Sequence, residues 1–146
     1  MDREEKASLV ERFYEQVWSR GEGDAVAEFV DADFINFGVR CGTGGMRMIV
    51  GLWRAAFPDL NYTVEDTVVE DEKVVARVTV TGTHTGEFRH PAMGVFAPTG
   101  KSFSVDQTHV FRRAGGRIIE HWATRNDLAL LQQLGVILSP ESARTP

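Results

Sequence analysis

Two histidines, His84 and His109, are the residues best suited by type and position to move a proton. Each alternates with apolar residues along a strand-like segment, so each side chain faces the interior or its rim. Imidazole titrates near neutral pH, which suits it to general acid–base catalysis. A buried histidine also costs free energy unless its ring nitrogens find partners. We therefore take both as candidate catalytic residues; the alternative for each is a hydrogen-bonded core histidine.

A second polar group follows the last apolar strand, within the stretch RIIEHWATRND at residues 117–127. Strand ends at a cleft are frequent positions for functional side chains. Asp127 offers a carboxylate for catalysis. It also directly precedes the apolar run 128–131, where an aspartate would cap a helix, so both interpretations remain open.

Strand parity sorts the other residues of this stretch. Trp122 lies an even number of residues from Asn126, so we predict that both face the cavity, with His121 turned to the opposite face. Arg125 is expected to form an ion pair at the surface or at an interface.

Composition and charge are those of an ordinary globular protein. The chain has 146 residues, of which 42% are hydrophobic and 25% charged, and its net charge is −5. Lysine and arginine are scattered, which argues against nucleic acid or an anionic membrane as partner. No stretch approaches the ~18 apolar residues of a membrane span, and the N-terminus is charged, so we expect a cytoplasmic protein.

The only cysteine is Cys41. A single cysteine cannot form an intramolecular disulfide, and it cannot supply a cluster of thiolate ligands for zinc. We therefore predict no metal site.

Hydrophobic periodicity divides the chain into a helical first part and a strand-rich second part. Apolar residues at spacings of three and four predict helices over residues 2–20, 24–30 and 44–57. After Pro58 the spacing changes to two, which predicts strands near 60–68, 74–84 and 101–112, and a last strand from 117. Short turns join them into hairpins.

These elements predict one α+β domain over residues 1–138, followed by a short frayed tail at 139–146. Three N-terminal helices should pack against a curved mixed or antiparallel sheet, forming a cone around an apolar pocket. Such a pocket, with few polar groups in its walls, suits a hydrophobic small molecule. The apolar loop 85–100 should cover the pocket or contact another subunit. The residues predicted to bind the ligand are Trp53, Phe57, Phe37, Gln107 and Trp122.

Six short blocks in fixed order carry a resemblance to a known family. They are FPDL at 57–60, VED at 64–66, GTHTGEF at 82–88, PTGK at 98–101, RIIEHW at 117–122 and LQQLG at 131–135. Each block alone is weak, but together they resemble the SnoaL-like polyketide cyclases of the nuclear transport factor 2-like superfamily over residues 5–137. The resemblance implies a cone-shaped α+β barrel, a homodimer or higher homo-oligomer, and aldol-type ring closure that needs no cofactor.

The chain departs from this family pattern at one position. Counted from His121, the acid–base aspartate of the family falls on Asn126, and an amide does not exchange protons near neutral pH. Three readings follow. In the first, Asp127 replaces the family's aspartate by a shift of one residue. In the second, His84 or His109 is the base and Asn126 orients a carbonyl group. In the third, the pocket binds its ligand without turnover or catalyses another reaction, such as hydrolysis or hydroxylation.

The sequence thus favours a cofactor-independent cyclase-type enzyme acting on a hydrophobic, carbonyl-bearing small molecule. Its candidate catalytic residues are His109, His84, Asn126 and Asp127. A noncatalytic ligand-binding or oligomerisation domain on the same fold is the alternative, because Asn126 stands where an aspartate is expected.

Overall fold

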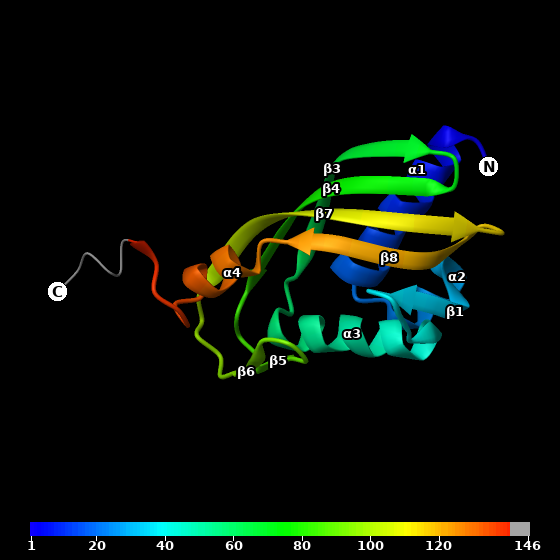
Figure 1. The fold of residues 1–146 in the computed structure, drawn as a ribbon. Helices are drawn as coiled ribbons and strands as arrows, with labels where there is room; N and C mark the ends of the chain where they lie inside the picture. The colour runs from blue at the N-terminus through cyan, green and yellow to red at the C-terminus, as the bar shows by residue number, and fades with distance from the viewer. Residues whose placement is uncertain (141–146) are drawn as a thin grey trace.

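The computed structural model describes residues 1–140 and shows helices packed on a strongly curved sheet (Figure 1). The helical elements are α1 (Arg3–Phe13), the π-helical turn η1 (Tyr14–Ser19), the 3₁₀ turn η2 (Gly23–Ala25), α2 (Val26–Phe29), α3 (Gly42–Ala56) and α4 (Asp127–Gln133). The predicted first helix is thus α1 continued by η1. Asp2 and Glu5 begin it with a reciprocal capping box.

The main sheet has six strands in the order β2-β1-β8-β7-β4-β3. Their bounds are β1 (Val30–Asn36), β2 (Val39–Arg40), β3 (Asn61–Glu70), β4 (Lys73–Thr83), β7 (Ser102–Ala114) and β8 (Arg117–Arg125). All neighbours are antiparallel except β1 and β8, which run parallel. The predicted mixed α+β fold is confirmed, and the sheet is mixed because of that one parallel pair.

The loop predicted over residues 85–100 contains a small hairpin of its own. Strand β5 (Phe88–His90) pairs with β6 (Gly94–Phe96), and this pair lies against α3 rather than in the main sheet (Figure 1). Phe88 is fully buried there, which explains why a glycine- and proline-rich segment carries large apolar residues.

The core lies between the helices and one face of the sheet. Along β4 and β7, buried and less buried residues alternate, as the period-two pattern predicted. On β7 the inward series includes Gln107, His109 and Phe111. Two polar side chains, Gln107 and His109, are therefore placed inside a mostly apolar layer, and they form part of the site described below.

Within residues 1–140, no helix combines the length and apolar character that crossing a lipid bilayer requires. Of the predicted frayed tail, residues 141–146 lie outside the described part of the chain.

Candidate active-site pocket

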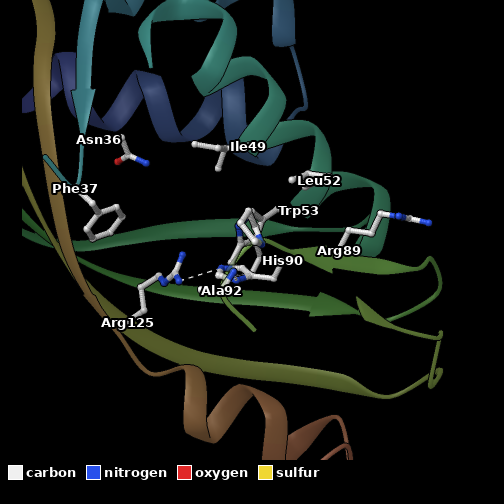
Figure 2. Close-up of a pocket in the computed structure, with 10 residues that line it drawn as sticks. Asn36, Phe37, Ile49, Leu52, Trp53, Arg89, His90, Ala92 and Arg125 are labelled. Atoms are coloured by element: carbon white, nitrogen blue, oxygen red, sulfur yellow. Dashed lines mark hydrogen bonds between the residues drawn. The ribbon is translucent and has the colours of Figure 1, made fainter. Parts of the chain in front are cut away.

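A pocket of about 320 Å³ opens between α3, the end of β1 and the β5–β6 hairpin (Figure 2). This volume is at the lower end of the range for small-molecule sites. Most of its wall is apolar, and its polar groups come from an asparagine, a histidine and two arginines. The lining residues are Asn36, Phe37, Ile49, Leu52, Trp53, Arg89, His90, Pro91, Ala92 and Arg125.

Arg125 is the charged group at the inner wall of this pocket. Its guanidinium carbon lies 5.5 Å from the centre of the Trp53 ring, within the range of a cation–π contact. Its side chain is only 23% exposed. Arg125 forms an ion pair, as the sequence predicted, but it does so at the wall of the pocket.

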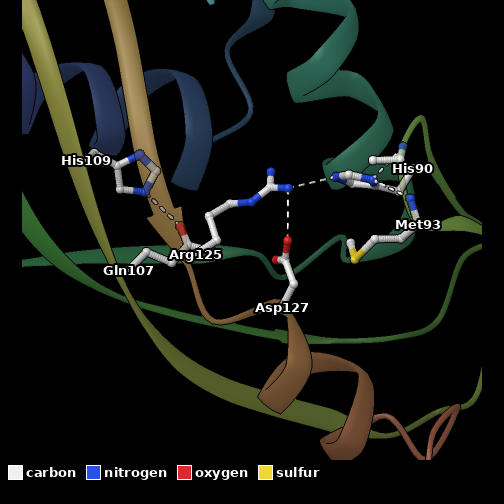
Figure 3. A network of polar contacts seen from close by, with 7 residues as sticks. His90, Met93, Gln107, His109, Arg125 and Asp127 are labelled. Atoms are coloured by element: carbon white, nitrogen blue, oxygen red, sulfur yellow. Dashed lines mark hydrogen bonds and ion pairs between the residues drawn. The ribbon is translucent and has the colours of Figure 1, made fainter. Parts of the chain in front are cut away.

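Two further side chains hold Arg125 in place (Figure 3). Its Nη2 donates to Asp127 Oδ2 at 3.0 Å and contacts His90 Nε2 at 3.1 Å. Burial lowers the pKa of His90, and the charge of Arg125 lowers it further, while Asp127 acts in the opposite direction. His90 is therefore neutral near pH 7.

A chain of polar side chains begins at Asn36 and runs under the sheet. Asn36 Oδ1 lies 2.7 Å from His121 Nδ1, and His121 Nε2 lies 2.7 Å from His109 Nδ1. His109 Nε2 lies 2.8 Å from Gln107 Oε1. Asn36 borders the pocket, and Gln107 borders a second hollow of about 340 Å³, so this relay, as we call the four residues, connects the two.

The relay can hold two protons or three. Asn36 Oδ1 and Gln107 Oε1 accept, so the ring nitrogens facing them carry hydrogen. A neutral imidazole has one N–H, which leaves no proton for the contact between His121 and His109. Either the pair carries one extra proton and one positive charge, or one amide turns its NH₂ group toward the imidazoles. The relay can therefore take up a proton and give it back.

The surroundings of the relay favour its neutral state. The rings of Tyr14 and Phe111 lie 5.4 and 6.1 Å from that of His109, and His109 is 5% exposed. Burial is the main cause that lowers the pKa of both histidines, to about 3 for His121 and well below the ordinary value for His109. Arg125 lowers both further, and His121 also lowers the pKa of His109.

A β-bulge turns His121 inward. Arg113 pairs with Ile118 and Arg112 with Glu120, so Ile119 is an extra residue on β8. Ile118 is buried on the inner face, and simple alternation from it would point residue 122 inward. The bulge reverses that parity, and His121 joins the inner face opposite Phe111.

Phe37 has a positive φ of 50° and begins the tight turn between β1 and β2. This left-handed conformation is uncommon for a bulky residue and often marks a functional site. The Phe37 ring packs edge-on against His121 and Trp122, at 5.4 and 6.0 Å between centroids. The turn thus holds an aromatic wall of the pocket next to the relay.

The predicted site residues divide into three groups. Trp53 and Phe37 line the pocket, Asp127 anchors Arg125, and Gln107 and His109 belong to the relay. His84 and Phe57 are fully buried in an aromatic cluster and do not line the pocket, although Phe57 packs against the lining residue Trp53.

Asn126 and Trp122 form the third group. Asn126 is exposed, makes no side-chain cap for α4 and borders the second hollow. Trp122 is 47% exposed on the outer side of the bulged strand and does not line the pocket.

Asn36 and His90 were not predicted from the sequence. Strand alternation predicted that His121 faces away from the cavity, whereas the bulge places it on the inner face. The approach of Asn36 to His121 depends on parallel pairing between residues 85 positions apart, for which the sequence carries no local signal. For His90 the sequence gave only a weak indication of a functional role, because it is a histidine in the apolar loop that was predicted to cover the pocket or contact another subunit.

Within residues 1–140, no group of three or more histidine, cysteine, aspartate or glutamate side chains is arranged to hold a metal ion.

The chain matches the family model described as SnoaL-like polyketide cyclase over residues 8–134. A related protein, the nogalonic acid methyl ester cyclase of Streptomyces nogalater, is 28% identical over 125 residues, which cover 81% of this chain and 89% of that protein.

Solved structures show the same fold. TsrD from Streptomyces laurentii superposes with a TM-score of 0.82 at 29% identity, covering 94% of this chain and 99% of TsrD. AclR from Streptomyces galilaeus, a proposed hydroxylase, gives a TM-score of 0.80 at 28% identity, covering 94% of this chain and 85% of AclR.

Proposed function

Because the chain belongs to the SnoaL-like polyketide cyclase family, we propose that it catalyses a cofactor-independent, aldol-type ring closure of a hydrophobic, carbonyl-bearing small molecule. The observation that carries this proposal is the relay, which can accept one proton and reaches the pocket wall through Asn36. The nogalonic acid methyl ester cyclase is a relative with a named ring-closing reaction, which supports the reaction class.

The proposed base is the imidazole pair. The substrate displaces the Asn36 amide, and the hydrogen of His121 moves from Nδ1 to Nε2, where it is donated to His109 Nδ1. The freed Nδ1 of His121 then takes a proton from the carbon alpha to a carbonyl group. The pair then holds three protons and one positive charge, enough for every contact in the relay. Burial keeps the pair neutral near pH 7, so a lone pair is available, and the negative charge that develops on the substrate offsets the cost of charging the buried pair.

Arg125 stabilises the negative charge that develops on the carbonyl oxygen. Its guanidinium is already oriented by Asp127 and by the Trp53 ring, so little reorganisation is needed during the reaction. The enolate carbon attacks a second carbonyl carbon and forms the new C–C bond. The relay returns its proton to the resulting alkoxide, which gives a hydroxyl group and restores the neutral pair.

The test separates proton removal from ring closure. Nogalonic acid methyl ester is a suitable first substrate, and exchange of its alpha hydrogen in D₂O, followed by NMR, reports proton removal alone. We expect His121→Asn and His109→Gln to slow exchange and closure by roughly 10²- to 10⁴-fold, the usual contribution of a positioned acid–base group.

Arg20→Gln is the matched control, because Arg20 is 60% exposed and pairs with Glu15 far from the pocket lining. It should exchange and close the substrate at the wild-type rate. If both histidine variants fold and retain wild-type exchange, the relay is not the base.

A noncatalytic ligand-binding role is the second candidate. It is favoured because all four ring nitrogens of His109 and His121 are already engaged, and because the described lining of the pocket contains no carboxylate. Binding of the substrate by the wild-type protein without exchange or closure would support this role.

A further inference from the structure

His90 has hydrogen donors on both sides of its ring. Its Nδ1 accepts from the backbone N–H groups of Ala92 and Met93, at 3.1 and 3.0 Å. Its Nε2 lies 3.1 Å from Nη2 of Arg125, which can only donate. A neutral imidazole must carry one hydrogen, so in either tautomer at least one N–H group points at another donor.

The less costly tautomer puts the hydrogen on Nε2, because Nδ1 then keeps both backbone donors. The Nε2–H of His90 then opposes the N–H of Arg125, with no acceptor between them. An oxygen atom beside this contact, about 2.8 Å from each nitrogen, would accept from both groups. The conflict is therefore removed by a ligand that brings an acceptor, and an anionic oxygen gains most because hydrogen bonds to charged groups are the stronger kind.

Arg125 has donors left for such a ligand. Asp127 and His90 contact only its Nη2, and no residue in the described part of the chain accepts from its Nε or Nη1. In a guanidinium, the parallel N–H pairs that match the two oxygens of a carboxylate are Nη1 with Nη2 and Nε with Nη2, so one carboxylate oxygen meets Nη2 and the other meets Nη1 or Nε. The third nitrogen remains a donor for the carbonyl oxygen of the substrate. Arg89 adds a second positive charge at the pocket wall, although Glu87 lies 2.5 Å from its Nε.

The remaining residues of the pocket wall indicate what the apolar part of the ligand is. Trp53 and Phe37 present aromatic rings, and Ile49 and Leu52 present aliphatic side chains. We propose that this pocket recognises an aromatic carboxylate, with one carboxylate oxygen beside His90 Nε2 and Arg125 Nη2, and the aromatic ring against Trp53. This assignment rests on the proposed function for the pocket and names its substrate class.

The test is equilibrium binding without turnover. Isothermal titration near neutral pH compares 2-naphthoate with 2-naphthamide, which has the same rings and size but no charge. We expect the wild-type protein to bind 2-naphthoate at least about tenfold more tightly, the preference that one charge-assisted hydrogen bond supplies. Arg125→Gln should abolish the preference and leave similar weak binding of both compounds.

A second variant covers the case in which Arg125→Gln does not fold. In His90→Gln the side-chain oxygen can accept from Arg125, so the conflict is resolved without a ligand, and the preference for 2-naphthoate should fall several-fold. Arg20→Gln, exposed and paired with Glu15, should retain the wild-type preference.

Equal affinity of the wild-type protein for the two compounds would overturn the assignment. So would an unchanged preference in a folded Arg125→Gln or His90→Gln protein. Neither result bears on the imidazole base, which hydrogen exchange tests separately, so the two proposals fail by different measurements.

Discussion

Two regions of the molecule bury histidine in opposite ways. His84 is fully buried among aromatic rings, with Phe57 at 5.4 Å and Phe88 at 6.4 Å between centroids. Its Nδ1 meets Thr99, whereas its Nε2 has no hydrogen-bond partner among the described residues. His109 is equally well buried, but both of its nitrogens are bonded within the relay.

The difference shows that burial alone does not make a histidine functional. Within residues 1–140, His84 contacts only the side chain and the backbone N–H of Thr99 through its Nδ1, and it packs as an aromatic ring. His109 is connected, through His121, to a residue of the pocket wall. A proton can enter or leave only where such a chain of partners exists, so the relay is the better place to look for acid–base chemistry.

The largest expected difference comes from replacing His109 and, separately, His84 with leucine, which has a similar size. His109→Leu leaves Gln107 Oε1 and His121 Nε2 without their His109 partner, while His121 Nδ1 keeps Asn36, so the free energy of unfolding should fall by about 2–4 kcal/mol. His84→Leu removes an unpartnered nitrogen and leaves only Thr99, which is partly exposed to water, so the loss should stay below about 1 kcal/mol.

Urea denaturation of the two variants and the wild type at neutral pH measures both values. Equal losses at His84 and His109 would remove the distinction between the two regions.

The dependence of stability on pH sharpens the same comparison. The pKa of His121 is about 3 in the folded protein and the ordinary value is 6.5, so the unfolded chain binds a proton first as the pH falls. Stability is therefore complete above about pH 6.5 and declines below it. His121 alone should cost roughly 2 kcal/mol between pH 6.5 and pH 5.

The His84 and His109 variants should differ in this profile as well. Burial lowers the pKa of both groups, but that of His109 lies well below the ordinary value, so its removal should flatten the decline more. Urea titrations at several pH values check this order. A steeper decline in His109→Leu than in His84→Leu would contradict it.

The smallest expected effect is at Asn126. Asn126→Asp places a negative charge at the start of α4, which should stabilise the protein by about 0.3–1 kcal/mol through the helix dipole. The side chain is exposed at the second hollow and outside the pocket lining, so alpha-hydrogen exchange should remain at the wild-type rate. Thermal unfolding and the exchange assay measure the two effects. Faster exchange would instead give the carboxylate at position 126 the role that the family pattern assigns to aspartate.

Most of the fold was predictable from local pattern. The helices and the long antiparallel strands follow from the spacing of apolar residues, because one buried face repeats every three to four residues in a helix and every two in a strand. The six family blocks supported the same architecture. The candidate site was predicted less completely: His109 and Gln107 were placed correctly on the inner face of β7, but their partners were not identified.

The missing partners depend on features that no local pattern carries. Asn36 meets His121 because β1 pairs in parallel with β8, far along the chain. His121 faces inward because of one extra residue at Ile119, and a bulge is visible only in the register between two strands. Arg125 reaches the pocket because Trp53 and Asp127 hold it there.

The sequence by itself determined the fold class, the family and the acid–base character of the inner face of β7. Only the tertiary structure decided which histidine is connected to the pocket and which is packed as core. The physical reason is that burial follows from periodicity within one element, whereas a hydrogen-bonded chain needs atoms of several strands within about 3 Å of one another. That proximity is set by strand order, register and one bulge, and these arise only when the sheet is assembled.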